Sequence, residues 1–315
     1  DGIDNNCDGQ IDEGCGQILQ YYSGAGQEGF ICETLQEPFM VKVTSSSGDA
    51  QSGTDIGWEV TTQPNGAGAS VTPASSATDS DGLASSPLKL GSLPGDYTVN
   101  ATCGECTEGS PQTFTATAKC PDVPQYYQDD YSDDYDGICK DYENLTSSGK
   151  PGVKQCASGN DETWKISEKG CALSSMAMVM GRYGSSASPS TWNQFLTQIG
   201  GYTKKDGNIW WTVPDVITGQ QIKFRRKSAY TGDIGMGITV PKSLMDDYLK
   251  KCIPVIVQVF NPHTGNPHWI LVTGKSSSDY TVNDPDSANK DLKLLSKYGE
   301  IYKIRPYENQ NGGCQ

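Results

Sequence analysis

Residues 168–184 read EKGCALSSMAMVMGRYG, and this stretch predicts a buried helix that begins at a cysteine. Apolar side chains recur there at the spacing of one helix face, at Leu173, Met176, Ala177 and Met180. Gly170 precedes Cys171, so the thiol is expected at the helix N-terminus. The helix dipole and the free N–H groups at that end favour a thiolate, which is the nucleophilic form. A disulfide or an inert core thiol is the alternative for Cys171.

Only two histidines, His263 and His268, can supply an imidazole beside that thiol. His268 begins the apolar stretch HWILVTG, which predicts a strand, whereas His263 lies in the turn-like NPHTGNP. Asp284 ends the next predicted strand. A hairpin turning around residues 275–279 would place Asp284 opposite residue 270, one diagonal step from His268. The carboxylate would then orient the imidazole, as in a catalytic triad. The alternative for Asp284 is an Asp-Pro turn.

These segments resemble a family when they are taken in order. GCALSSMAM, PVIV, HWILVTG and YTVNDP are similar to papain-like cysteine peptidases related to the bacteriocin leader-processing, or double-glycine, peptidases, over residues 152–306. The resemblance implies an α+β fold with Cys171 as nucleophile, His268 as general base and Asp284 as orienting acid. It also implies Gln155 as an oxyanion-hole donor, together with the backbone N–H of Cys171. The implied reaction is hydrolysis of an amide bond in a peptide or protein substrate.

The overall composition excludes several other classes of protein. The 315 residues carry 24 Lys and Arg against 38 Asp and Glu, a net charge of −14, which argues against binding nucleic acid. The sequence has no run of 18 or more apolar residues, so no membrane span is expected. Two histidines are too few for a His-rich metal or haem site. The length predicts several domains.

The eleven cysteines are spread along the whole chain and do not follow the spacing of a zinc site. Disulfides in an oxidising location, extracellular or at the cell surface, are therefore expected. An odd count leaves one cysteine unpaired or reactive, and a reduced Cys171 would account for it. The pairs considered are Cys7–Cys15, Cys32–Cys120, Cys103–Cys106, Cys139–Cys156 and Cys252–Cys314.

Residues 17–120 predict a β-sandwich. The segments FMVKVTS, GWEVTT, YTVNATC and TFTATAKC alternate as strands do, and Gly-containing turn signals separate them. This stretch resembles bacterial Ig-like domains of the invasin type, which implies a spacer or an adhesive module. The predicted fold class is thus a multidomain chain with an Ig-like β-sandwich followed, from residue 151 to residue 315, by the α+β papain-like domain.

Residues 1–16 predict a calcium-binding loop. Asp4, Asn6, Asp8, Gln10 and Asp12 fall at successive odd positions of an EF-hand-like loop, and Gly9 permits its sharp turn. The bidentate Glu that usually closes such a loop is missing, although Glu13 is close. The segment resembles the Asp-rich metal-binding repeat of MopE-type secreted bacterial proteins. A solvated acidic tail is the alternative.

Residues 121–150 are acidic and rich in tyrosine, and predict a linker. Their aspartates fit no defined calcium loop, so a solvated or surface-wrapping segment is favoured over a second metal site. Further along, Trp210 and Trp211 predict a core position or the wall of a cleft. A sugar-binding or protein-binding adhesin that uses this Trp pair is another possibility.

Two classes of function remain open from the sequence. The first is a secreted cysteine peptidase, which could process itself or join surface proteins if an amine replaces water. The second is a structural subunit of an extracellular filament or surface assembly that retains a peptidase-like fold. Self-assembly into a polymer would distinguish the second from the first.

Calcium removal tests the N-terminal loop. A ligand that binds the folded state raises stability, so chelation should lower the melting temperature by a few degrees. Differential scanning calorimetry with and without chelator measures this shift, and an Asp4→Asn, Asp8→Asn variant should abolish it. An unchanged melting temperature in the unaltered protein would contradict the calcium prediction.

Overall fold

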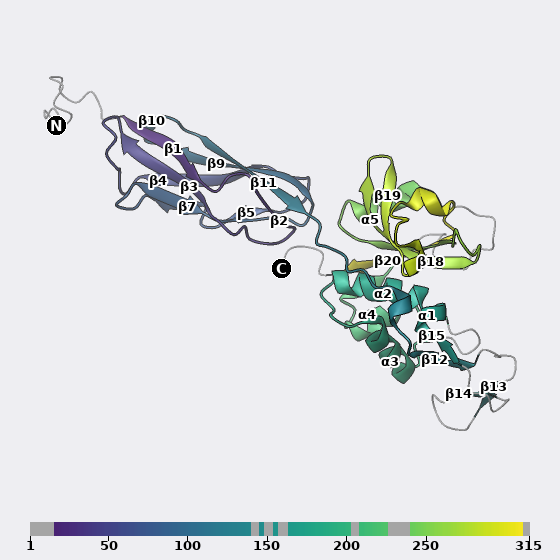
Figure 1. The fold of residues 1–315 in the computed structure, drawn as a ribbon. Coiled ribbons are helices and arrows are strands. Elements are labelled where there is room, and N and C mark those ends of the chain that lie inside the picture. Colours follow the sequence, from purple (N-terminus) through teal and green to yellow (C-terminus); the bar gives the residue numbers. More distant parts are fainter. Residues whose placement is uncertain are drawn as a thin grey trace, which may run out of the picture. The chain divides into compact units, whose positions relative to one another are not determined.

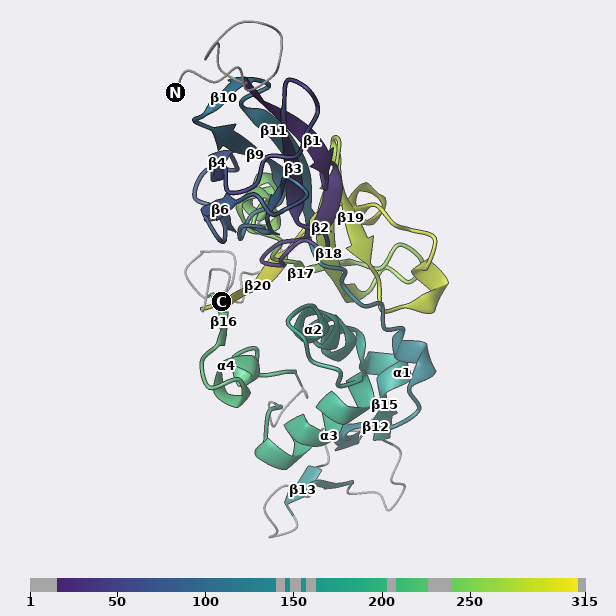
Figure 2. The ribbon, with the colours of Figure 1, turned by 90° about the vertical axis from the view of Figure 1, so that its left-hand side faces the viewer.

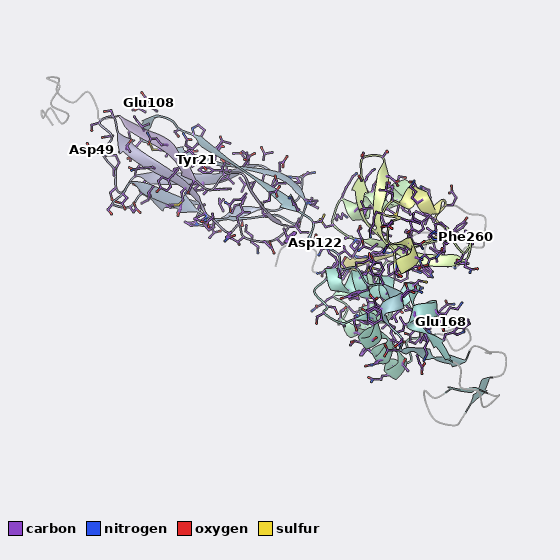
Figure 3. The ribbon with its side chains drawn as sticks, in the orientation of Figure 1. Tyr21, Asp49, Glu108, Asp122, Glu168 and Phe260 are labelled. Atoms are coloured by element: carbon purple, nitrogen blue, oxygen red, sulfur yellow. A yellow bond between two sulfur atoms is a disulfide. The ribbon has the colours of Figure 1, made fainter. Side chains whose placement is uncertain are left out.

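The computed structural model describes residues 16–139, 145–147, 154–156, 163–202, 208–225 and 240–310. Of residues 136–139, 145–147, 154–156 and 163 it describes the backbone alone. The chain divides into two compact units, and the second begins at Asp122 (Figures 1 and 3). Among the described residues, no helix has the length and apolar character that crossing a membrane requires.

The first unit is a sandwich of two β-sheets that share one hydrophobic core. One sheet has the strand order β10-β1-β3-β7 and the other β2-β11-β9-β4-β6, while β5 and β8 form a separate pair. The strands are β1 (Gln17–Ser23), β2 (Gln27–Phe30), β3 (Phe39–Ser45), β4 (Asp55–Thr62), β5 (Ser70–Val71), β6 (Ser75–Ala77), β7 (Leu83–Ser86), β8 (Leu88–Lys89), β9 (Gly95–Cys103), β10 (Cys106–Glu108) and β11 (Gln112–Lys119).

Alternation of apolar and polar residues determines which side chains fill this core. In β9, Tyr97, Val99 and Ala101 are buried while the residues between them are more exposed. Phe114 of β11 meets Phe39 of β3 from the other sheet, with ring centroids 4.9 Å apart. Burial of each such ring contributes about 1.5–3 kcal/mol. The four strands predicted by alternation are β3, β4, β9 and β11, so the predicted β-sandwich is confirmed.

Disulfides occur in this unit at predicted cysteines. Cys103 and Cys106 are bonded to each other across the β9–β10 turn, as predicted. Cys32 and Cys120 are each disulfide-bonded, and they follow the parallel strands β2 and β11 at the same end of the sheet. Their predicted mutual pairing is consistent with that geometry and stays a prediction.

The second unit is built on a five-stranded antiparallel sheet of strand order β16-β20-β17-β18-β19. Helix α2 packs on one face of this sheet (Figure 2), and a second core cluster lies on the other. The strands are β16 (Ile222–Phe224), β17 (Val255–Phe260), β18 (Pro267–Ser276), β19 (Asp279–Asn283) and β20 (Lys303–Asn309). The helices are α1 (Ile166–Lys169), α2 (Cys171–Arg182), α3 (Pro189–Ile199), α4 (Val213–Ile217) and α5 (Asp246–Leu249), with 3₁₀ turns η1 (Gln128–Asp130), η3 (Lys242–Met245), η4 (Ser287–Asn289) and η5 (Leu295–Tyr298).

Helix α2 is more deeply enclosed than a one-sided stripe predicts. Every residue from 172 to 180 is buried, including Ser174 and Ser175. The sheet covers one side of the helix, and α3 together with tyrosines from residues 122–135 contributes to the same core. A helix that is surrounded in this way is a central element, so the cysteine at its start is held in a fixed position.

The acidic segment predicted as a linker is folded into the second unit. Residues 122–135, which we call the strap, contain η1 and lead into β12 (Asp134–Cys139), which pairs with β15 (Thr163–Lys165). Tyr126 and Tyr131 pack against the core and Tyr135 is buried. Aromatic burial thus outweighs the charge of the segment, whose Asp134 forms an ion pair with Lys165.

Candidate active site

Cys171 is the first residue of α2, as the sequence predicts. Gly170 joins α1 to α2, and its N–H donates to the carbonyl of Ile166 while its own carbonyl accepts from Ser174. A Cβ at Gly170 would lie 2.4 Å from the Ile166 carbonyl oxygen, so only glycine fits this tight junction. Among the described cysteines, Cys171 is the free one, and it is partly exposed.

His268 lies near the start of β18, opposite Val259 of β17, and is 6% exposed. The β18–β19 pairing sets Leu271 opposite Asn283, so Asp284 follows at the level of residue 270. This is the register that the hairpin prediction required. The His268 Nε2 lies 2.6 Å from Asp284 Oδ1, and Asp284 is 3% exposed. Because the carboxylate is an acceptor, Nε2 donates the proton of this bond.

The other ring nitrogen of His268, Nδ1, is left to meet the thiol of Cys171. Burial raises the pKa of this thiol. A hydrogen bond from His268, its positive charge and the backbone N–H groups of Trp269 and Ala172 outweigh burial, so the pKa of Cys171 lies below its usual value. The sulfur therefore lies where a thiolate is stabilised from several directions.

His268 responds in the opposite sense. Burial lowers the pKa of its imidazole, but the hydrogen bonds to Asp284 and to Cys171, and the charges of both, outweigh burial and raise the pKa to about 10. A lowered thiol pKa beside a raised imidazole pKa favours the thiolate and imidazolium over the neutral thiol and imidazole. The structure thus brings together three of the four predicted site residues, Cys171, His268 and Asp284.

The carboxylate of Asp284 has further partners that sequence reasoning missed. The Asp286 N–H donates to Oδ1 at 2.7 Å, and the Tyr298 hydroxyl donates to Oδ2 at 2.7 Å. Gln125 of the strap donates to the main-chain oxygen of Asp284 at 2.8 Å. Tyr298 lies in the short 3₁₀ turn η5, and such a turn is too short for a hydrophobic period in the sequence to predict its contact with Asp284.

Gln128 of the strap lies between the two halves of this site. Its backbone N–H donates to the carbonyl of Pro285 at 2.7 Å, and its Nε2 donates to the carbonyl of Ser167 at 2.8 Å. Gln128 is 8% exposed, and among the described residues its Oε1 has no hydrogen-bond partner. It therefore bridges the turn after the acid and the helix before the nucleophile. The stretch QYYQ around it carried no signal beyond its tyrosines.

Gln155, the predicted oxyanion-hole donor, lies in β14 (Lys154–Cys156), opposite Thr146 of β13 (Leu145–Ser147). Its side chain lies outside the described part of the chain. The oxyanion role of Gln155 stays a prediction.

The second histidine and the tryptophan pair lie around this site without joining the triad. His263 is exposed in the loop before β18, and its Nδ1 lies 2.6 Å from Asn289 Oδ1. Trp211 packs on Trp269, the residue after His268, at a centroid distance of 4.8 Å, while Trp210 is 54% exposed. The guanidinium of Arg305 lies beneath both packed rings. Trp211 thus occupies a half-buried position near the site.

Metal ligands do not gather in the described ranges. No group of three or more His, Cys, Asp or Glu side chains there is placed to hold an ion. The aspartates of the strap are used otherwise: Asp129 accepts from the Ser287 N–H, and Asp133 accepts from Ser190. The predicted calcium ligands Asp4, Asn6, Asp8, Gln10 and Asp12 lie outside the described residues.

A family model described as the Peptidase_C39 like family matches residues 150–310. The chain belongs to this family. No curated protein matches the chain. The family assignment covers the second unit, and with it Cys171, His268 and Asp284 lie inside a cysteine peptidase-like domain.

Several solved structures show weak similarity to this Peptidase_C39-like chain. The D00-D0 domain of Intimin is 19% identical over 36% of this chain and 51% of its own, with a TM-score of 0.25. The Yersinia pseudotuberculosis adhesin InvE is 14% identical over 33% and 32%, with a TM-score of 0.27. Surface layer protein SbsC, domains 4-9, is 9% identical over 92% and 30%, with a TM-score of 0.25. The chain thus spans about half the length of the Intimin structure.

Alkylation tests the ion pair of this Peptidase_C39-like site. Iodoacetamide attacks the thiolate, so Cys171 should react fully below the ordinary thiol pKa of about 8.5. A His268→Ala variant loses the partner that lowers the thiol pKa, and its reaction rate near pH 6 should fall at least about tenfold, because each pKa unit changes the thiolate fraction tenfold.

Peptide mass spectrometry without reductant, over about pH 4 to about pH 10, measures both rates. His263→Ala is the matched control, since it removes the chain's other histidine and should leave the rate unchanged. Protection of Cys171 from alkylation, or the same rate in His268→Ala, would contradict the ion pair.

Proposed function

We propose that this protein is a secreted cysteine peptidase that hydrolyses amide bonds through an acyl-enzyme on Cys171. The observation that carries the proposal is the chain of contacts from the Cys171 thiol through His268 to the buried Asp284. A structural thiol needs no imidazole, and a solvated turn carboxylate needs no buried partner. Membership in the Peptidase_C39 like family supports the same conclusion.

The site supplies each proton transfer that amide hydrolysis needs. The Cys171 thiolate attacks the carbonyl carbon, and the imidazolium of His268 gives its proton to the leaving amine. His268, now neutral, takes a proton from water as that water attacks the thioester, and departure of the carboxylic acid product restores the thiolate and the imidazolium. Asp284 holds the ring and stabilises its charged form throughout.

The oxyanion formed in each step needs donors, and the start of α2 offers the backbone N–H of Cys171. We infer a second donor in Gln128. One N–H of its side-chain amide is directed at Ser167, and the second remains for a ligand. Gln155 is the rival candidate from sequence resemblance. The burial of Gln128 between α1 and the turn after Asp284 favours Gln128 over Gln155.

Location and accessory regions form part of this proposal. Disulfide bonding at Cys32, Cys103, Cys106, Cys120 and Cys252 supports an extracellular or cell-surface location, because reducing compartments keep thiols reduced. The β-sandwich would act as an Ig-like spacer, and the N-terminal loop would bind a structural calcium ion. A surface protein, or another copy of this chain, would be a substrate of suitable class.

The same acyl-enzyme permits a variant reaction and leaves a contrasting function to test. An amine in place of water would yield a new amide, which is transpeptidation. A structural subunit of a filament would need no such chemistry, and its site would be free to lose the hydrogen bonds that hold Asp284. The contacts from Tyr298, Asp286 and Gln125 therefore favour the enzyme.

Peptidase activity is the direct test of the proposal. The protein, incubated with a proteome-derived peptide library, should produce new termini by mass spectrometry, and Cys171→Ala should produce none. The Cys171→Ala protein added as a substrate tests self-processing. Activity should fall as pH rises through about 10, where His268 loses the proton that the leaving amine needs. A polymer by size-exclusion chromatography, with no cleavage and no acyl-enzyme, would support the structural alternative.

Two glutamine variants separate the oxyanion candidates. Loss of one oxyanion donor lowers kcat about 10²- to 10³-fold, so Gln128→Ala should show this loss with little change in KM. Gln155→Ala serves as the matched comparison and should stay within about threefold of the unaltered protein. The opposite ranking, measured on the same peptide substrate, would restore the sequence-based choice. Melting temperatures of both variants control for misfolding.

A further inference from the structure

The carboxylate of Asp284 is held at both of its oxygens. Oδ1 accepts from His268 Nε2 and from the Asp286 N–H. Oδ2 accepts from the Tyr298 hydroxyl at 2.7 Å, and in the part of the chain that the structure describes this is the one hydrogen bond to that oxygen. The orientation of the carboxylate about its own axis therefore depends on Tyr298.

Tyr298 is well placed to act as a permanent donor. It is 5% exposed, in η5, and Gly299 follows it with a φ of +76° that ends the turn. Its hydroxyl lies 2.7 Å from Asp284 Oδ2 and 3.2 Å from the carbonyl of Leu292. A phenol has one hydrogen, and the nearer, charged acceptor takes it. Burial, then the charge and hydrogen bond of Asp284, raise the pKa of Tyr298, so the hydroxyl keeps its proton.

The loss of this donor would affect His268 through Asp284. A buried carboxylate oxygen without a partner is costly, so the group would rotate or admit water to satisfy Oδ2. Either change weakens the 2.6 Å bond that Oδ1 makes with Nε2. The imidazolium would lose part of the stabilisation that keeps it charged beside the thiolate.

We propose that Tyr298 is a positioning residue of the active site, which holds the Asp284 carboxylate in line with His268 and so maintains the thiolate–imidazolium pair. The importance of Tyr298 for catalysis rests on the proposed function. The predicted change in the pKa of His268 is independent of that function. The hydrogen bond between Tyr298 and Asp284 joins η5 to the turn after β19. Tyr298, 127 positions after Cys171 in the sequence, thereby contacts the carboxylate that supports His268.

Other ionisable groups face this cluster from the elements packed around it. Cys171 lies at the start of α2, Asp286 follows Asp284 in the turn, and Asp129 of the strap accepts from Ser287. His263 is in the loop before β18, and Arg305 of β20 lies against the Trp269 ring. All of them are retained when Tyr298 becomes phenylalanine, so a shift in that variant reports the hydroxyl.

The two histidines of the chain allow a direct test by NMR, because the ring signals of His268 and His263 can be followed separately. In Tyr298→Phe, the pKa of His268 should fall by about one unit, whereas that of His263 should not move. The kcat for peptide cleavage should fall about tenfold with KM nearly unchanged. An unmoved or raised His268 pKa overturns the proposal.

Tyr280→Phe is a matched control in the same unit. Tyr280 is also 5% exposed, and its hydroxyl donates to Asp246 Oδ1 at 2.8 Å, so this variant loses a partly buried Tyr–Asp hydrogen bond of nearly the same length. Both variants should lose some melting temperature, but only Tyr298→Phe should move the pKa of His268. An equal His268 shift in both variants would mean a merely structural effect, and would overturn the proposal.

A second measurement applies if Tyr298→Phe does not fold. In the unaltered protein, the Tyr298 hydroxyl proton should exchange slowly and give a downfield signal that disappears in Asp284→Ala. Absence of that signal overturns the proposal. Failure of the peptidase proposal would give a different result. The protein would then show neither cleavage nor an acyl-enzyme, while the pKa of His268 would still be raised.

Discussion

The contact between the Cys171 thiol and the His268 imidazole is the interaction on which the chemistry proposed for the second unit depends. Neither partner is charged by default, since burial opposes the thiolate and the imidazolium alike. Each favours the charged form of the other, and a third group, Asp284, lies behind the ring and favours the imidazolium. The fold therefore has to bring a helix start, a strand start and a strand end to one point with ångström precision.

Three parts of the unit meet this demand by different physical means. The start of α2 is fixed by close packing, with Gly170 pressed against the Ile166 carbonyl. His268 and Asp284 are fixed by antiparallel register, which leaves no freedom to slide by one residue without turning each side chain to the opposite face. The strap is fixed by hydrogen bonds from Gln125 and Gln128 to the turn that carries the acid.

Sequence reasoning reached the parts of this site that periodic patterns encode. The 3.6-residue period located α2, and the two-residue period with a short hairpin located Asp284 relative to His268. It did not reach Tyr298 or Gln128, because both lie in short 3₁₀ turns whose contacts depend on tertiary packing. The strap was also hard to predict, since its carboxylates indicate solvent while its tyrosines are drawn into the core.

The strap has a consequence for where the peptidase unit starts. The family match begins at residue 150, yet the groups that hold the Asp284 turn in place begin near Val123 and Gln125. A fragment that begins at residue 150 would lack the strap. It would lose the hydrogen bond from Gln125 to Asp284, and the core around α2 would lose the strap tyrosines that pack in it. The boundary between the two compact units lies at the Pro121–Asp122 junction, so a change in the length of the connection there would leave the strap and its contacts with the Asp284 turn intact.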